Sequence, residues 1–190
     1  MRHFKPSTLN IKRTNMIYFE RGSENDVISD DDLQAGLNMA LSKVGERNKV
    51  LIVPPDYTRY HSRAGILTSD VYHYYGDKVA DILPALGTHA GMSDEEIEHM
   101  FQGVPKDLFR VHDWRNDVVT LGKVPGEVVS KLTNGGLDYD WPAQVNKLIR
   151  DGGHDLILSI GQVVPHEVIG MANYNKNIFV GTGGAEGINK

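Results

Sequence analysis

The 190-residue sequence contains no cysteine. Disulfide bridges, thiolate metal sites and cysteine nucleophiles are therefore excluded for this chain. A chain without cysteine is compatible with the cytoplasm, which is the location we expect. The sequence also has no apolar run near the roughly 18 residues that a membrane-spanning helix needs, so we expect no membrane partner.

Basic charge is scarce as well. The 20 Lys and Arg residues stand against 25 Asp and Glu residues, which leaves a formal net charge of −5. Because domains that bind nucleic acid carry a basic patch or stripe, we expect no nucleic-acid partner. One basic run, made of Arg2, Lys5, Lys12 and Arg13, is interpreted as a solvated arm, since it lacks the apolar core of a signal peptide.

Two catalytic signatures are missing from the chain. It has neither a Walker A motif nor a G-x-S-x-G nucleophile elbow, so we expect neither a P-loop nucleotidase nor a serine hydrolase of the elbow type. What the chain does contain is an ordinary globular composition, with 40% hydrophobic and 24% charged residues. At this length it can bury a sizeable core.

Strand and helix patterns alternate along most of the chain. This alternation predicts an α/β fold, with a largely parallel sheet flanked by helices. Strands are predicted over residues 16–19, 50–53, 79–86, 109–112, 118–121, 127–132, 156–160 and 177–180. Helices are predicted over residues 33–44, 63–75, 93–102 and 140–151.

Reactive side chains follow three of the predicted strands. The clearest strand, residues 50–53, is apolar throughout and stops at two prolines. In parallel α/β sheets, ligands bind just beyond the carboxyl ends of the strands, so groups that follow different strands meet at one edge. The groups in question are Asp56, Thr58, Arg59, His89 and His166.

This set of side chains suits chemistry on a small acid. A pair of histidines can act as base on one face of a substrate and as acid on the other, since imidazole titrates near neutral pH. An arginine fork binds a carboxylate at two points. A carboxylate such as Asp56 can fix the tautomer of a neighbouring histidine.

Two further features could have a functional role or only a structural one. The loop Gly181-Thr182-Gly183-Gly184 could offer backbone N–H groups to a phosphate, or it could be a flexible turn. Among the other histidines, His61 is a candidate because it lies near Arg59. Metal binding by His61 and His89 is possible in principle, but neither shows a recognisable ligand spacing.

The segments Pro55-Asp56-Tyr57-Thr58-Arg59, Gly87-Thr88-His89 and Pro165-His166 resemble the nickel-dependent lactate racemase family. The resemblance runs from about Lys49 to the end of the chain, and Lys176, ten residues after His166, adds to it. It implies that residues 1–190 are an N-terminal catalytic and substrate-binding domain. It also implies that the histidine ligating nickel and a C-terminal domain lie beyond Lys190, so that this fragment is inactive alone.

The resemblance implies a reaction and a set of roles. Family members invert a 2-hydroxy acid by passing a hydride to and from a nickel-pincer nucleotide, a modified pyridinium cofactor. By resemblance, His89 and His166 exchange the hydroxyl proton, and Arg59 binds the substrate carboxylate with support from Asp56 and Thr58. Cofactor binding is assigned to Lys176, as covalent anchor, and to the loop Gly181, Thr182, Gly183 and Gly184.

One segment departs from the family pattern. The anchoring lysine of the family follows a Phe-Ser-Gly-Gly type turn, whereas Met171 to Asn175 precede Lys176 here. Two alternatives to a racemase remain open at this point. The chain could be a non-catalytic module that binds an anion or nucleotide through Arg59 and the glycine loop, or a hydrolase with a histidine-bound metal.

Overall fold

The computed structural model describes residues 16–189, and the chain divides into two compact units, Met1–Gly45 and Glu46–Lys190. The basic arm proposed from the sequence lies outside the described residues. In the first unit, the predicted helix is confirmed as α1 (Asp30–Val44). It begins with a capping box, in which the Ser29 hydroxyl accepts from the backbone N–H of Asp32 and the Asp32 carboxylate accepts from that of Ser29.

The second unit contains a parallel sheet of three strands in the order β2-β1-β5. These strands are β1 (Val50–Val53), β2 (Val79–Ile82) and β5 (Leu156–Ser159). β1 lies in the centre and is buried along its whole length, as a strand covered on both faces must be. The predicted α/β class and the parallel pairing are therefore confirmed.

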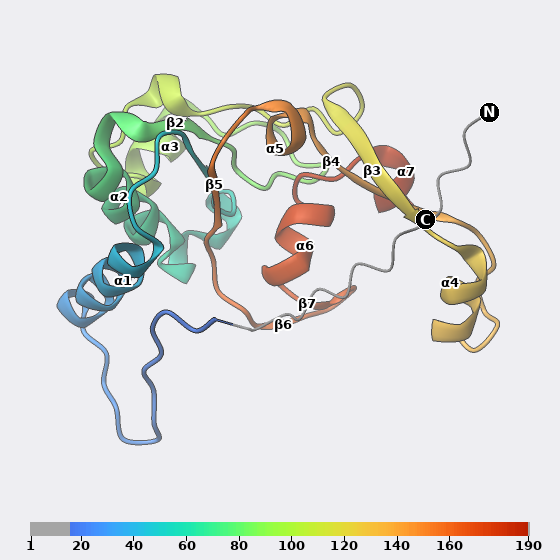
Figure 1. Ribbon diagram of the computed structural model, residues 1–190, viewed down its shortest axis with the longest axis horizontal. Coiled ribbons are helices and arrows are strands. Elements are labelled where there is room, and N and C mark those ends of the chain that lie inside the picture. Colours follow the sequence, from blue (N-terminus) through green and yellow to red (C-terminus); the bar gives the residue numbers. More distant parts are fainter. Residues whose placement is uncertain (1–15, 190) are drawn as a thin grey trace. The chain divides into compact units, whose positions relative to one another are not determined.

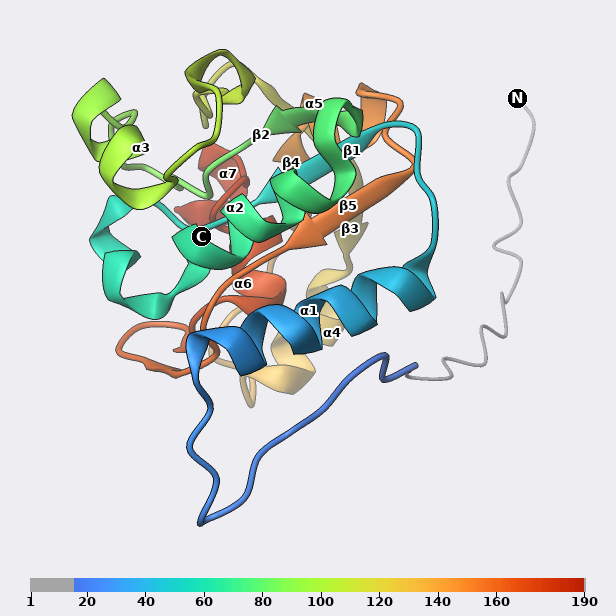
Figure 2. The same cartoon turned by 90° about the vertical axis from the view of Figure 1, so that its left-hand side faces the viewer.

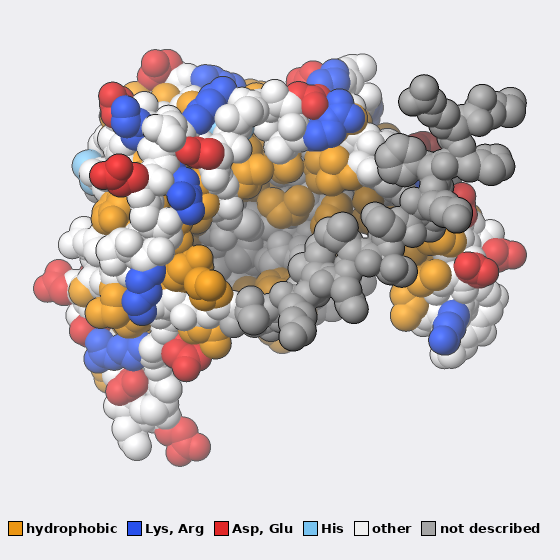
Figure 3. Space-filling model, viewed as in Figure 1, with side chains coloured by type: hydrophobic (Ala, Val, Ile, Leu, Met, Phe, Trp, Pro, Cys, Tyr) orange, Lys and Arg blue, Asp and Glu red, His pale blue; other side chains and the backbone are white. Residues whose placement is uncertain are grey.

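Helices cover both faces of this sheet. Figures 1 and 2 show α2 (Ala64–Tyr75) on one face and α5 (Lys147–Asp151) and α6 (Tyr174–Phe179) on the other. Because side chains alternate along a strand, one set of sheet residues packs against α5 and α6. That cluster contains Leu51, Val53, Leu83 and Ala85, with Leu148, Ile149 and Ile178 packed against it. Figure 3 shows hydrophobic side chains exposed near α5 on this face of the molecule.

The remaining elements extend from the sheet. An antiparallel pair, β3 (Val118–Val124) and β4 (Trp141–Asn146), carries α4 (Gly126–Leu132) at its far end (Figure 1). The other elements are the short helices η1 (Tyr57–Ser62), η2 (Gly76–Lys78), η3 (Lys106–Leu108), α3 (Asp94–Met100) and α7 (Ala185–Ile188), and the ribbon of β6 (Pro165–His166) with β7 (Gly170–Met171). Among residues 16–189, no helix has the length and apolar character needed to cross a membrane.

Several predicted elements are wrong. Residues 16–19 form no strand, and residues 109–112 form only an isolated bridge from Phe109 to Ile82. The segment 127–132 is the helix α4, because its valines alone do not distinguish a strand from a short helix. The predicted strand 79–86 ends at Ile82, although Leu83 and Ala85 still donate backbone hydrogen bonds to Ile52 and Pro54.

Two further errors lie close to the candidate site. Residues 140–151 were expected to form one helix, but the first half is β4, whose register with β3 outweighs the helix-compatible spacing of Val145 and Leu148. Residues 177–180 were expected to form a strand, but Asn177 to Phe179 belong to α6. In consequence the glycine loop at 181–184 follows a helix and not a strand.

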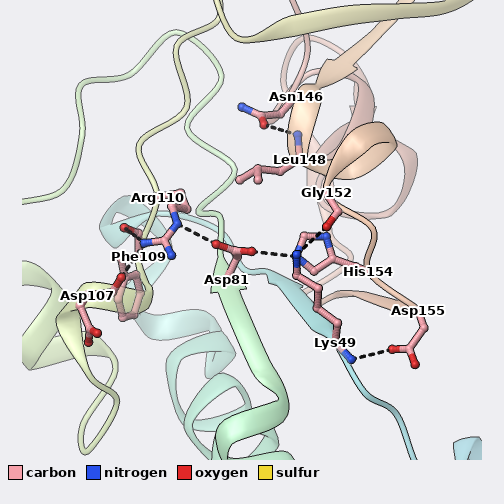
Figure 4. Close-up of polar contacts among 10 residues, drawn as sticks. All are labelled: Lys49, Asp81, Asp107, Phe109, Arg110, Asn146, Leu148, Gly152, His154 and Asp155. Atoms are coloured by element: carbon pink, nitrogen blue, oxygen red, sulfur yellow. Dashed lines mark hydrogen bonds and ion pairs between the residues drawn. The ribbon is translucent and has the colours of Figure 1, made fainter.

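An ion-pair network is centred on Asp81, the third residue of β2. Asp81 of β2 accepts a hydrogen bond from Arg110 Nε at 2.7 Å and one from His154 Nε2 at 2.8 Å (Figure 4). The His154 side chain is only 1% exposed, whereas that of Arg110 is 40% exposed. The network therefore ties β2 to the segment that enters β5 and to the chain after η3.

Candidate active site

A cavity of about 620 Å³ lies beyond the carboxyl ends of the sheet strands. Its lining includes most of the residues that the sequence predicted for the site, from segments far apart in the chain. The predicted residues that line it are Asp56, Thr58, Arg59, His89, His166, Lys176 and Gly181. The volume lies within the range of about 300–1,000 Å³ that is usual for small-molecule sites.

Asp56 organises the turn that follows β1. Pro54 and Pro55 end the strand, and the Asp56 carboxylate then caps η1 by accepting from the backbone N–H of Thr58 at 3.2 Å. The Thr58 hydroxyl donates to the same carboxylate oxygen. These bonds fix the start of η1, where Arg59 lies with the non-helical angles φ −111° and ψ 27°.

The second oxygen of Asp56 holds His89. The distance from Asp56 Oδ2 to His89 Nδ1 is 2.5 Å, and Asp56 is 7% exposed. Since an ionised carboxylate can only accept, His89 Nδ1 must carry the proton. The neutral ring therefore keeps a lone pair on Nε2, which makes His89 a ready proton acceptor.

His166 lies in the β6–β7 ribbon, which forms another wall of the cavity. Its Nδ1 accepts a hydrogen bond from the backbone N–H of Val168 at 3.1 Å. The Glu167 carboxylate is 3.6 Å from the same nitrogen, which is too long for a hydrogen bond. The neutral ring therefore carries its proton on Nε2, from which it can donate a hydrogen bond to a ligand.

Lys176 reaches the cavity from α6. Burial lowers the pKa of its amine, and the nearby Arg59 guanidinium lowers it further, while Asp56 and Glu167 oppose the change. A lysine with a lowered pKa holds more of its amine in the neutral, nucleophilic form near neutral pH. The lysine and the arginine also make this part of the cavity attractive to an anion.

The glycine loop divides between the cavity and the interior. Gly181 lines the cavity, and its carbonyl accepts from the backbone N–H of Gly87 at 2.8 Å, beside the His89 turn. Thr182, Gly183 and Gly184 are buried and do not line the cavity. The backbone N–H groups of residues 181–183 donate to carbonyls of α6 and Val180, so they are not available to cradle a phosphate.

A buried histidine outside the cavity fixes this loop. His112 Nε2 donates to the Gly183 carbonyl at 2.9 Å, and its Nδ1 accepts from Asn146 Nδ2 at 3.0 Å. Burial lowers the pKa of His112. Both nitrogens of the neutral ring are satisfied, so the side chain holds the loop against β4 without a charge.

The sequence prediction identified only Lys176 in a stripe along α6. Asn173, Lys176, Asn177 and Val180 all line the cavity, and their spacing of i, i+3, i+4 and i+7 is that of one helix face. This spacing was present in the sequence, but the apolar run after Asn177 favoured a strand. His61, a candidate from the sequence, lies elsewhere, because it lines a separate cavity of about 420 Å³.

Within residues 16–189, no three His, Asp or Glu side chains are grouped closely enough to hold a metal ion. The cavity instead brings together a carboxylate that orients one histidine, a second histidine of the opposite tautomer, and two cations. Such a set can bind a small carboxylic acid and move a proton on it.

The fold and this cavity define an α/β protein with a candidate acid–base site at the carboxyl ends of a parallel sheet. The family model for the lactate racemase N-terminal domain matches residues 34–190, so the chain belongs to that family. The resemblance inferred from the sequence is thereby confirmed. No curated protein matches the chain.

Two solved structures are similar to most of the chain. A protein from Thermotoga maritima gives a TM-score of 0.72 at 26% identity, and the match covers 85% of this chain and 40% of that protein. The lactate racemase apoprotein from Thermoanaerobacterium thermosaccharolyticum gives a TM-score of 0.55 at 25% identity, over 75% of this chain and 32% of the racemase. The chain thus spans less than half the length of either protein.

Proposed function

We propose that this chain is the catalytic N-terminal domain of an enzyme that inverts a 2-hydroxy acid. The observation that carries the proposal is the pairing of His89, oriented by Asp56, with His166 in one cavity that also contains Arg59. The similarity to lactate racemase supports the same reaction class. A longer protein would supply the remaining part of the site from a C-terminal domain.

Arg59 is proposed to bind the substrate carboxylate. A planar guanidinium can donate two parallel hydrogen bonds to a carboxylate, which fixes both the position and the orientation of the acid. The Asp56 cap and the Thr58 hydroxyl hold the turn that carries Arg59. Racemisation needs this orientation, because both faces of the same Cα must react in turn.

The two histidines are proposed to exchange the hydroxyl proton of the substrate. In its neutral form His89 offers a lone pair on Nε2, because its Nδ1–H donates to Asp56. His89 can therefore take the proton when the hydroxyl becomes a carbonyl, and His166, in its imidazolium form, can return one when the carbonyl is reduced. After one turnover the protonation states are exchanged, which suits a reaction that runs in both directions.

The cavity suits one part of the cofactor that the family implies, the nickel-pincer nucleotide. When bound, that cofactor would supply an acceptor and donor for the Cα hydrogen as hydride. Lys176, whose amine is half-buried and lowered in pKa, is proposed as its anchor, and Gly181 borders the same wall.

The test uses the full-length protein produced together with the enzymes that assemble the cofactor. We expect it to convert one lactate enantiomer into the racemic mixture, measured by chiral chromatography. Loss of a positioned acid or base should cost about 10²–10⁴-fold in rate, so His89→Asn and His166→Asn should each fall by that factor. His61→Asn is the matched control, because His61 lines a different cavity.

Two results would overturn the proposal. One is an unchanged rate in both histidine variants while His61→Asn behaves like the wild type. The other is binding of hydroxy acids, seen as a thermal shift, by a cofactor-loaded protein that converts none of them. The second result would favour the non-catalytic anion-binding alternative.

A further inference from the structure

Asn177 is a buried polar side chain between three parts of the candidate site. It is 3% exposed, and its Nδ2 donates to the carbonyl of Val53 at 2.9 Å and to the hydroxyl of Ser159 at 3.1 Å. Val53 is the last residue of β1 and Ser159 is the last residue of β5. One side-chain amide therefore ties α6 to the carboxyl ends of two neighbouring strands.

Each of the three joined segments leads directly to a site residue. The turn that begins after Val53 carries Asp56, the chain after Ser159 continues to the ribbon with His166, and Lys176 precedes Asn177 in α6. The Val53 carbonyl also accepts from the backbone N–H of Ile160 at 3.1 Å. The hydrogen bonds of Asn177 thus complete the sheet ladder at the point where both strands end.

The helix α6 needs such an attachment. It has six residues, and isolated helices shorter than about 12–15 residues are marginal in water. Its N-terminal side offers little support, since Asn173 makes no side-chain cap and both Asn173 and Tyr174 have a φ of 53°. Tertiary contacts must therefore set where α6 lies and how deeply Lys176 enters the cavity.

We propose that Asn177 is a positioning residue, which fixes Lys176 in the cavity by holding α6 against the ends of β1 and β5. The functional meaning of this role rests on the proposed function, in which Lys176 anchors the cofactor. The lowered pKa of the Lys176 amine agrees with it, since burial is the largest cause of that shift. If α6 moves outward, Lys176 loses its burial and its pKa returns toward the ordinary 10.5.

The test measures the reactivity of Lys176 without cofactor or substrate. The protein is treated with trinitrobenzenesulfonate over a pH series, and modification of Lys176 is followed by peptide mass spectrometry. For the wild type we expect a midpoint below 10.5, and for Asn177→Leu a midpoint shifted upward. Leucine has a similar volume and no charge, so any shift reflects the lost hydrogen bonds and not a new electrostatic neighbour.

Two variants keep the test decisive. Asn175→Leu changes an exposed asparagine on the other side of Lys176 and should keep the wild-type midpoint. Ser159→Ala removes one of the two acceptors while leaving Asn177 in place, so it should shift the midpoint in the same direction by less. If Asn177→Leu does not fold, Ser159→Ala still decides. A wild-type midpoint in folded Asn177→Leu, or in Ser159→Ala when Asn177→Leu does not fold, would overturn the proposal.

The test of the positioning role of Asn177 can fail or succeed independently of the test of the proposed function. In an active full-length enzyme, misplacing a reacting group by about 1 Å costs on the order of 10²-fold, so Asn177→Leu should lower kcat by about that factor. An inactive full-length protein would refute the racemase while leaving the reactivity result intact, and an active one with unchanged Lys176 reactivity would refute only the positioning role.

Discussion

At the scale of single residues, Tyr174 occupies a backbone conformation that glycine adopts most easily. Its φ is 53°, and so is that of Asn173 before it. In most L-residues this left-handed conformation costs about 1–2 kcal/mol, because Cβ approaches the following carbonyl.

Replacing Tyr174 by glycine should therefore stabilise the protein. The relief of strain exceeds the greater chain entropy of glycine in the unfolded state, so the free energy of unfolding should rise by about 0.5–1 kcal/mol. Urea denaturation measures the change. Tyr174→Ala is the control, since it removes the same side chain, which is 70% exposed, and keeps the strain. Equal stability of the two variants would show that the turn is not strained.

Asp81 should matter more for stability than its partner Arg110. Removing the Asp81 side chain leaves the buried Nε2 of His154 without an acceptor, and an orphaned buried donor costs about 1–3 kcal/mol. Arg110 is 40% exposed, so its pair with Asp81 should contribute only about 0–1 kcal/mol. Urea denaturation of Asp81→Ala and Arg110→Ala compares the two, and a cost for Arg110→Ala as large as that for Asp81→Ala would contradict this ranking.

At the scale of elements, Gly181 lets the end of α6 approach the chain beyond β2. A Cβ at this position would lie 2.5 Å from the Cβ of Ala85 and 2.5 Å from the carbonyl oxygen of Asn177. Neither neighbour is the flexible end of a side chain, so Gly181→Ala must displace one of the two segments. Overpacking of this kind costs about 1–3 kcal/mol.

The displacement should also reach the site, because the Gly181 carbonyl binds the backbone N–H of Gly87 two residues before His89. We therefore expect Gly181→Ala to lower the melting temperature and to alter the chemical shifts of His89. Gly122→Ala serves as the control, since a Cβ there meets no atom within 4 Å. If both variants melt at the same temperature, the close approach at Gly181 does not limit the size of the residue at this position.

The elements show which sequence patterns decide a structure and which do not. β1 was predictable because four apolar residues followed by two prolines favour a short buried strand. α3 was predictable because Ser93 and Glu96 have the spacing of a capping box, and the structure contains that box. α6 was not predictable from its local pattern. Its position depends on hydrogen bonds from Asn177 to residues more distant in sequence, which no local propensity encodes.

At the scale of the whole molecule, some features of the candidate site could be predicted from the sequence and others could not. The residues of the Asp56 turn, His89 and His166 could be grouped from the sequence, because parallel strands bring their carboxyl ends to one edge. Their tautomers could not, since these depend on the Asp56 carboxylate and on the backbone N–H of Val168. The role of the glycine loop was also out of reach, because its N–H groups are used by α6.

The pH dependence of global stability tests how the loop is held. Burial lowers the pKa of His112 in the folded protein below the ordinary 6.5, while Asp113 and Asp117 oppose the shift. As pH falls below 6.5, the unfolded chain binds a proton that the folded protein resists, so the free energy of unfolding decreases. The contribution of the neutral His112 ring to stability is therefore complete above pH 6.5. It is lost as the pH falls toward the lower pKa of His112 in the folded protein.

Thermal melting from pH 7.5 down to pH 5 should therefore show a fall in melting temperature that His112→Gln reduces. Glutamine can keep a polar contact in the loop but cannot take up the proton, so its curve should be flatter even if it melts lower at pH 7.5. His73→Gln is the matched control, because His73 is exposed and its replacement should leave the wild-type slope. A His112→Gln curve parallel to the wild type would show that another group causes the acid sensitivity, and that the neutral His112 ring does not hold Gly183 in place.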